Sequence, residues 1–192
     1  MSELDPSRTA LLVMDYQPGI LNRVEDPDAL AAKARAAIAT LREAGATIGY
    51  VRVAFSEEDL EAMPDGAPMA RVKQMPAGSM SADSPMTQVD ERVAPQDGDI
   101  IVRKVRVGAF GTTDLDQQLR ARGVDTLVLA GISTSGVAIS TLIEAHDLDY
   151  RLYLPADATA DPDPELHASL IGGFFPKRDE VIEVADLEAL LA

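Results

Sequence analysis

The chain has 192 residues, a formal net charge of −15 at pH 7 and no cysteine. Its length predicts a single domain over residues 1–192, and its composition, 46% apolar and 26% charged, is typical of a globular protein. The acidic balance argues against nucleic acid or an anionic membrane as partner, because phosphate groups need clustered Lys and Arg. The lack of cysteine excludes disulfides and thiolate chemistry.

No apolar run approaches the length that crosses a bilayer, and residues 1–5 lack a basic and then apolar signal pattern. We therefore expect a cytoplasmic protein whose partner is a small-molecule substrate.

Short apolar runs alternate with stretches of helical period along the chain. The first run, Thr9 to Met14, is almost continuously apolar and ends at Asp15, which is typical of a strand buried on both faces. The strands are expected at 9–14, 47–55, 99–104, 126–131, 150–156 and 181–184.

Helices are expected between these strands, at 27–45, 113–123, 135–148 and 164–173. Asp26-Pro27 has the cap and proline that begin a helix, and Thr113 with Asp116 resembles a capping box. The alternation predicts an α/β fold of three layers, with helices on both faces of a central, mostly parallel six-stranded sheet.

The segment 56–98 interrupts this alternation and carries five of the seven methionines and five of the twelve prolines. Long segments of weak periodicity are often lids or binding segments, and methionine suits a surface that repacks around ligands. A meandering cover or subunit contact, with one short helix near 87–93, is an equally open interpretation.

Polar residues follow three of the expected strands. Asp15 ends the first and Lys104 the third, and residues 131–137 lead from the fourth strand into a helix. In open parallel sheets, ligands bind beyond the carboxyl ends of the strands, where a carboxylate, an amine and free helix N–H groups can form a site. Taken singly, each is more often a loop anchor, a solvated charge or a helix cap.

Together these segments resemble the motifs of the isochorismatase-like cysteine hydrolases. Residues 11–17 resemble the first-strand motif of that family, and 101–110 its lysine strand. Residues 127–141 are similar to its signature LAGIxTSGCxxST, and 157–167 match its downstream loop. The resemblance covers nearly the whole chain and implies the Rossmann-like fold of that family.

The resemblance implies a catalytic triad of Asp, Lys and Cys. Asp15 and Lys104 match its first two members, but Val137 stands at the cysteine position. A valine is no nucleophile, so the covalent amidase mechanism of the family is excluded there. The resemblance also implies that the backbone at Ile132, Ser133, Gly136 and Val137 lines an oxyanion pocket, with a non-prolyl cis peptide at Ser133.

Four hydroxyls lie near this position, those of Ser133, Thr134, Ser135 and Ser140. A hydroxyl nucleophile needs a positioned base and the correct aim, so we do not expect a serine nucleophile here.

Isochorismatases proper use a second chemistry that needs no thiol: the aspartate protonates a vinyl ether carbon and water adds afterwards. By this resemblance Asp15 is a general acid or base and Lys104 places and balances charge. A neighbouring ammonium lowers the pKa of a carboxyl group, so burial has to oppose the ion pair. Val137 is bulkier than the glycine usual in isochorismatases, so isochorismate is not assigned as the substrate.

Three other residues invite two interpretations each. Arg52 and Arg106 either bind a substrate carboxylate or pair with surface acids. Phe110 is either an apolar pocket wall or a core aromatic.

No cofactor or catalytic metal is expected. His146 and His167 show no ligand spacing. The metal-binding Asp-x-His element of nicotinamidases, which belong to the same superfamily, has no counterpart at 55–59. Nucleotide-binding glycine motifs are absent from the sequence.

Two hypotheses follow. The chain is either a hydrolase that acts on a small polar or anionic substrate through Asp15 and Lys104, or a non-catalytic relative that binds a ligand or serves in an oligomer. The resemblance further implies a homo-oligomer, a dimer or tetramer.

Overall fold

The computed structural model describes residues 3–191 and is built on a six-stranded sheet in which all paired strands run parallel. The strands are β1 (Thr9–Met14), β2 (Thr47–Val53), β3 (Ile100–Lys104), β4 (Thr126–Gly131), β5 (Arg151–Pro155) and β6 (Glu180–Ile182). Their order, β3-β2-β1-β4-β5-β6, places β1 between β2 and β4. The predicted α/β fold is confirmed, with a sheet that is entirely parallel rather than mostly so.

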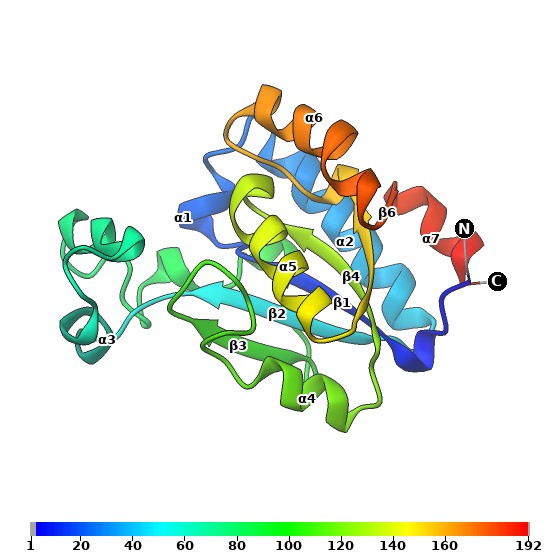
Figure 1. Ribbon diagram of the computed structural model, residues 1–192, viewed down its shortest axis with the longest axis horizontal. Coiled ribbons are helices and arrows are strands. Elements are labelled where there is room, and N and C mark those ends of the chain that lie inside the picture. The colour runs from blue at the N-terminus through cyan, green and yellow to red at the C-terminus, as the bar shows by residue number, and fades with distance from the viewer. Residues whose placement is uncertain (1–2, 192) are drawn as a thin grey trace.

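Helices cover both faces of the sheet (Figure 1). They are α1 (Pro18–Leu21), α2 (Pro27–Glu43), α3 (Glu57–Ala62), α4 (Leu115–Ala121), α5 (Ile139–Asp147), α6 (Pro164–Gly173) and α7 (Leu187–Leu190). Along β1, Leu11 and Val13 pack on the side of α2 and α7, whereas Leu12 and Met14 pack on the side of α4 and α5. Burial on both faces explains why β1 is apolar without interruption.

The longest helix, α2, begins as its sequence predicts. The Asp26 carboxylate accepts a hydrogen bond of 2.9 Å from the backbone N–H of Ala29, and Pro27 occupies the first turn. Its apolar stripe, which includes Leu30 and Leu41, is buried against the sheet. Within residues 3–191 no helix has the length and apolar character that a membrane crossing needs.

The capping box predicted at Thr113 is wrong. The cap residue of α4 is Asp114, and it makes no side-chain capping bond. The Asp116 carboxylate instead accepts from the hydroxyl of Tyr150 at 2.8 Å and pairs with Arg120 one turn later. The Asp116 carboxylate, which the local sequence pattern assigned to the start of the helix, is therefore bound by a tertiary partner, Tyr150.

Residues 56–82 form an arm that projects from the carboxyl ends of β2 and β3 and carries α3 (Figure 1). The base of the arm is closed by backbone hydrogen bonds from Phe55 to Met80 (2.9 Å) and from Ala82 to Phe55 (3.1 Å). The arm has a small apolar cluster of its own, around Phe55, Met63 and Val72. The single helix predicted near 87–93 is wrong, because two short 3₁₀ turns, Pro85–Thr87 and Glu91–Val93, lie there.

Candidate functional site

Asp15 is the first residue beyond β1, and its backbone is bent out of the strand. Its φ of 60° lies in the left-handed region, which Asp tolerates better than most residues. Its N–H still donates to the Val51 carbonyl at 2.8 Å, so the bend starts from a fixed point on β2. The bend sets the Asp15 carboxyl at the carboxyl edge of the sheet.

Lys104, the last residue of β3, reaches across the end of β2 to this carboxyl. Its Nζ lies 2.7 Å from Oδ2 of Asp15, and the two side chains are 1% and 8% exposed. The same ammonium group donates to the carbonyl of Val107. The structure therefore brings together the two charged residues that the sequence indicated, as a buried ion pair.

Burial raises the pKa of Asp15, and the attraction of Lys104 opposes this without reversing it. The second carboxyl oxygen, Oδ1, is buried and has no hydrogen-bond partner among the described residues. A carboxyl group in this state holds a proton to higher pH than a solvated aspartate does. It is suited to donate that proton to a bound molecule.

Opposite the ion pair, the chain leaves β4 through a cis peptide bond between Ile132 and Ser133 and enters a π-helical turn, Thr134–Ala138. The cis bond lies where the family resemblance implied one. Val137 is 2% exposed, and its Cγ1 would lie 3.1 Å from a Cβ placed on Gly131. A Cβ on Gly136 would lie 2.6 Å from Oγ of Ser133, so a side chain at this position would require the Ser133 hydroxyl to move.

These residues line a cavity of about 280 Å³, which we call the Asp15 cavity. Its lining comprises Asp15, Ile20, Arg23, Val53, Met69, Arg71, Lys104, Arg106, Val107, Ile132, Ser133, Gly136, Val137, Asp161 and Pro162. All six positions expected at the catalytic pair and the backbone pocket are among them. Met69 and Arg71 come from the arm, so the Met-rich segment reaches the site.

The rim of the cavity carries three exposed arginines, Arg23, Arg71 and Arg106. Within residues 3–191 none of the three forms an ion pair with a carboxylate, although acidic residues outnumber basic ones 32 to 17. Five other arginines are paired with acids: Arg8, Arg42, Arg92, Arg103 and Arg120. Of the rim arginines, sequence reasoning singled out only Arg106, because Arg23 and Arg71 lie in segments without a strand-end signal.

A buried Asp–Lys pair at parallel strand ends, facing a turn with a cis peptide, agrees with the resemblance of the motifs. The family model of the isochorismatase domain matches residues 9–186. The chain belongs to the isochorismatase family.

Relatives in the isochorismatase family extend over most of the chain. The isochorismatase family protein YecD of Escherichia coli O157:H7 is 34% identical, covering 97% of this chain and 98% of that protein. Ureidoacrylate amidohydrolase RutB of Stutzerimonas stutzeri is 33% identical, covering 83% and 72%. An isochorismatase family protein of Burkholderia thailandensis has a similar structure, with a TM-score of 0.85, 27% identity and coverage of 100% and 98%.

Two residues considered for substrate binding lie outside the Asp15 cavity. Arg52 donates to the carbonyls of Ala82 and Thr87, both at 3.1 Å, and so holds the chain where it leaves the arm. Arg52 does not line the Asp15 cavity, and among the described residues it forms no ion pair with a surface acid. Phe110 stacks on Tyr150 at 5.8 Å between ring centroids and belongs to the core. Of the two interpretations of Phe110, the structure supports a core aromatic rather than a wall of the Asp15 cavity.

Two of the four hydroxyls near Val137, those of Thr134 and Ser135, already have hydrogen-bond partners. Ser135 donates its Oγ–H to Asp161 at 2.6 Å, and Oγ of Thr134 lies 2.7 Å from Nδ1 of His167. Ser133 lines the cavity, but in the described part of the chain its hydroxyl is not hydrogen-bonded to a base. Neither Ser135 nor Ser140 lines the cavity.

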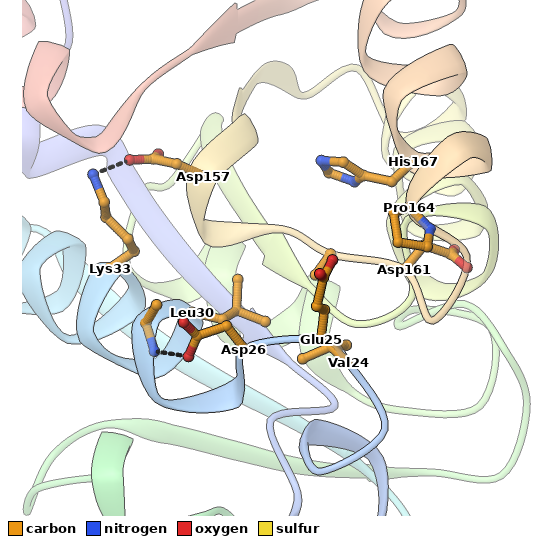
Figure 2. A pocket seen from close by; sticks show the side chains of 11 residues that line it. Val24, Glu25, Asp26, Leu30, Lys33, Asp157, Asp161, Pro164 and His167 are labelled. Atoms are coloured by element: carbon orange, nitrogen blue, oxygen red, sulfur yellow. Dashed lines mark hydrogen bonds and ion pairs between the residues drawn. The ribbon is translucent and has the colours of Figure 1, made fainter.

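A second cavity, of about 300 Å³, shares Asp161 with the first and lies between α6 and the start of α2 (Figure 2). The ion pair of Lys33 with Asp157 (2.6 Å) borders it, and His167 extends toward it from α6. His146 lies elsewhere, 2.8 Å from Asp179. Among residues 3–191 no three His, Cys, Asp or Glu side chains are grouped so that they could hold a metal ion.

Proposed function

We propose that this protein is a hydrolase that cleaves a small anionic substrate by acid catalysis from Asp15, without a covalent enzyme intermediate. The observation that carries the proposal is the buried Asp15 carboxyl at the floor of the cavity. Its pKa is raised by burial, and Lys104 lies 2.7 Å from one of its oxygens while the other oxygen has no partner.

The proposed reaction starts from an enol ether, in which a carbon–carbon double bond carries an oxygen substituent. Asp15 gives its proton to the far carbon, so an O–H bond breaks, a C–H bond forms and the oxygen-bearing carbon becomes cationic. Water adds to that carbon and its proton returns to the Asp15 carboxylate. The C–O bond of the hemiketal then breaks, as the departing oxygen takes the proton of the Asp15 carboxyl and the hemiketal hydroxyl gives its own proton back to Asp15, which releases a carbonyl compound and an alcohol. Lys104 stabilises the carboxylate between these proton transfers.

The charge of the rim supports an anionic substrate. Arg23, Arg71 and Arg106 approach the cavity from three separate segments, and none of them forms an ion pair within the described residues. Guanidinium groups bind carboxylates through two parallel hydrogen bonds, so a carboxylate at the rim gains charge-assisted contacts. Because the cavity measures about 280 Å³, it suits a small molecule rather than a polymer.

A second candidate function is ligand binding without catalysis, and the packing of Val137 favours it. Val137 lines the cavity with a buried apolar side chain that packs close to Gly131, and it offers no reactive group. On this hypothesis a carboxylate ligand binds, but no bond is cleaved. A cytoplasmic location and a homo-oligomer remain predictions under either function.

The test is turnover of a panel of small carboxylate-bearing enol ethers and N-carbamoyl amides by the natural chain and by Asp15→Asn. We expect Asp15→Asn to lose activity by about 100- to 10,000-fold, the usual contribution of a positioned acid. Asp97→Asn makes the same charge change at an exposed position and is expected to retain full activity.

Because Asp15→Asn leaves the Lys104 charge buried, the double variant Asp15→Asn with Lys104→Met serves as a second inactive form without that charge. Full activity in either folded variant contradicts the acid role of Asp15. Carboxylate binding without turnover of any panel member by the natural chain establishes the second function instead.

A further inference from the structure

The turn that carries Val137 is not held by a cap of its own. Ser133, the residue before the π-helical turn Thr134–Ala138, makes no side-chain capping bond. The contacts that fix the turn come from residues 160–167, the segment that leads from the end of β5 into α6. We call this stretch the 160–167 segment.

Asp161 makes the densest of these contacts. Its Oδ2 accepts from both the backbone N–H and the Oγ–H of Ser135, at 2.8 and 2.6 Å, and its Oδ1 accepts from the N–H of Asp163 at 3.1 Å. The residue is 7% exposed. Burying a carboxylate is costly unless it is hydrogen-bonded, and three donors on two oxygens meet that requirement.

Three further contacts hold the turn and the end of β4 that leads into it. The N–H of Thr134 donates to the Ala160 carbonyl at 2.8 Å, and the N–H of Ala160 donates to Gly131 at 3.2 Å. The buried hydroxyl of Thr134 lies 2.7 Å from the His167 ring, and burial lowers the pKa of His167, which favours the neutral imidazole. The turn is therefore tied to one neighbouring segment at both Thr134 and Ser135.

The charge of Asp161 calls for an explanation. Its carboxylate lines the same cavity as Arg23, Arg71 and Arg106, where a negative charge weakens the binding of an anion. Recognition of an anionic substrate therefore does not account for it. Its hydrogen bonds to Ser135 do, because they orient the turn that faces the ion pair.

We propose that Asp161 is a positioning residue, which holds the turn 134–138 so that residue 137 faces Asp15 and Lys104. The proposal rests on the proposed function only in taking the Asp15 cavity as the reaction site. Misplacing a group at a reaction site by about 1 Å can cost about 100-fold in rate. The correct position of this turn can therefore offset the desolvation cost of burying the Asp161 carboxylate.

A single introduced thiol can report on this geometry, because the chain has no cysteine of its own. In Val137→Cys the thiol lines the same cavity as the Lys104 ammonium, so we expect its pKa to lie below the ordinary value of about 8.5. The readout is the rate of alkylation by iodoacetamide as a function of pH. It needs no substrate and is independent of turnover.

The decisive comparison is between Val137→Cys alone and the same variant with Asp161→Asn. The loss of the Asp161 charge and the loss of its positioning role predict opposite changes in the alkylation rate. Removing a negative charge near the thiol stabilises the thiolate and speeds alkylation at neutral pH. Loss of the clamp lets the turn move away from Lys104, so we expect alkylation to slow by about 10- to 100-fold and the thiol pKa to rise.

Two additional variants complete the test. Ser135→Ala removes one of the two bonds between Asp161 and Ser135 without a change of charge, and we expect a smaller loss of rate, about 3- to 10-fold. Asp163→Asn makes the same charge change as Asp161→Asn two residues away, at the exposed cap of α6, and is expected to leave the rate unchanged.

Equal or faster alkylation in the Asp161→Asn background overturns the proposal, as does an unchanged rate with Ser135→Ala. The second comparison decides the question if Asp161→Asn does not fold. A thiol in Val137→Cys that titrates like a free cysteine also overturns it, because residue 137 then does not face the ion pair. None of these results bears on turnover by the natural chain, which Asp15→Asn tests separately.

Discussion

The floor and the rim of the Asp15 cavity differ in how their charged residues are supported. At the floor, Asp15 and Lys104 extend from the ends of two strands and are 8% and 1% exposed. At the rim, Arg23, Arg71 and Arg106 are exposed and come from loops and the arm. The sheet holds the floor residues in a rigid frame. The rim residues lie on loops and the arm, whose sequence can change without disturbing the packing of the core. The floor is therefore suited to chemistry and the rim to the choice of substrate.

The largest effect is expected at the floor, from Lys104→Met. This variant leaves Asp15 buried without its counter-charge, and breaking a buried pair from one side costs about 3–5 kcal/mol of unfolding free energy. Urea unfolding at neutral pH measures the loss. The control is Lys73→Met, which breaks an ion pair with the fully exposed Asp65 on the arm and is expected to cost much less.

The loss in Lys104→Met should depend on pH in a defined direction. Because the pKa of Asp15 is raised in the folded state, that state binds a proton which the unfolded chain has already released. The proton bound by Asp15 therefore stabilises the folded state fully at pH values below about 4, the pKa of this carboxyl in the unfolded chain. This contribution to the free energy of unfolding is lost as the pH rises through the higher pKa of the folded state. The variant should therefore recover stability on acidification. A penalty that is equal at acidic and neutral pH contradicts a buried, proton-binding Asp15.

The next effect is the pH profile of kcat/KM in the natural chain. An acid catalyst is active while protonated, so kcat/KM should be level at low pH and fall about tenfold per pH unit above the raised pKa of Asp15. A profile that rises with pH over the same range shows that Asp15 acts as a base.

The smallest effect is expected at the rim, from Arg71→Gln. Losing one charge-assisted contact to a substrate carboxylate should raise KM about tenfold and leave kcat nearly unchanged. Arg35→Gln makes the same charge change on the exposed side of α2, away from the Asp15 cavity, and should leave KM unchanged. An equal fall of kcat in Arg71→Gln shows that the arm takes part in the chemistry, and the contrast between floor and rim then fails.

The same contrast explains which residues the sequence could indicate. Asp15 and Lys104 could be predicted because the carboxyl ends of parallel strands meet at one edge of the sheet, where ligands bind. Polar side chains at these strand ends therefore lie close together. Arg23 and Arg71 could not, because their position depends on how a loop and the arm fold back over the sheet. Arg52 illustrates the opposite case: its partners are the backbone carbonyls of Ala82 and Thr87, which no local pattern indicates.

Local signals were informative where no tertiary contact competed with them. Helix α2 begins at its Asp-Pro cap as predicted. The capping box expected at Thr113 does not form, because the Asp116 carboxylate accepts a hydrogen bond from Tyr150 instead. Helix α3 did have a usable signal: Ser56 and Asp59 form a reciprocal capping box, with bonds of 3.1 and 2.8 Å. The role of Asp161 required the fold, because it joins residues 26 positions apart.

The strand order also has a consequence for synthesis of the chain. β1 pairs with β2 from Thr47 onward, but its other edge pairs with β4, which starts only at Thr126. Until that part of the chain leaves the ribosome, β1 has an open edge, and its Leu12 and Met14 face lacks α5. An open apolar edge is a site for aggregation, so ribosomal pausing before Thr126 should be harmful. The strand that positions Asp15 is the first to be made, and it is enclosed on both edges only once β4 has been made.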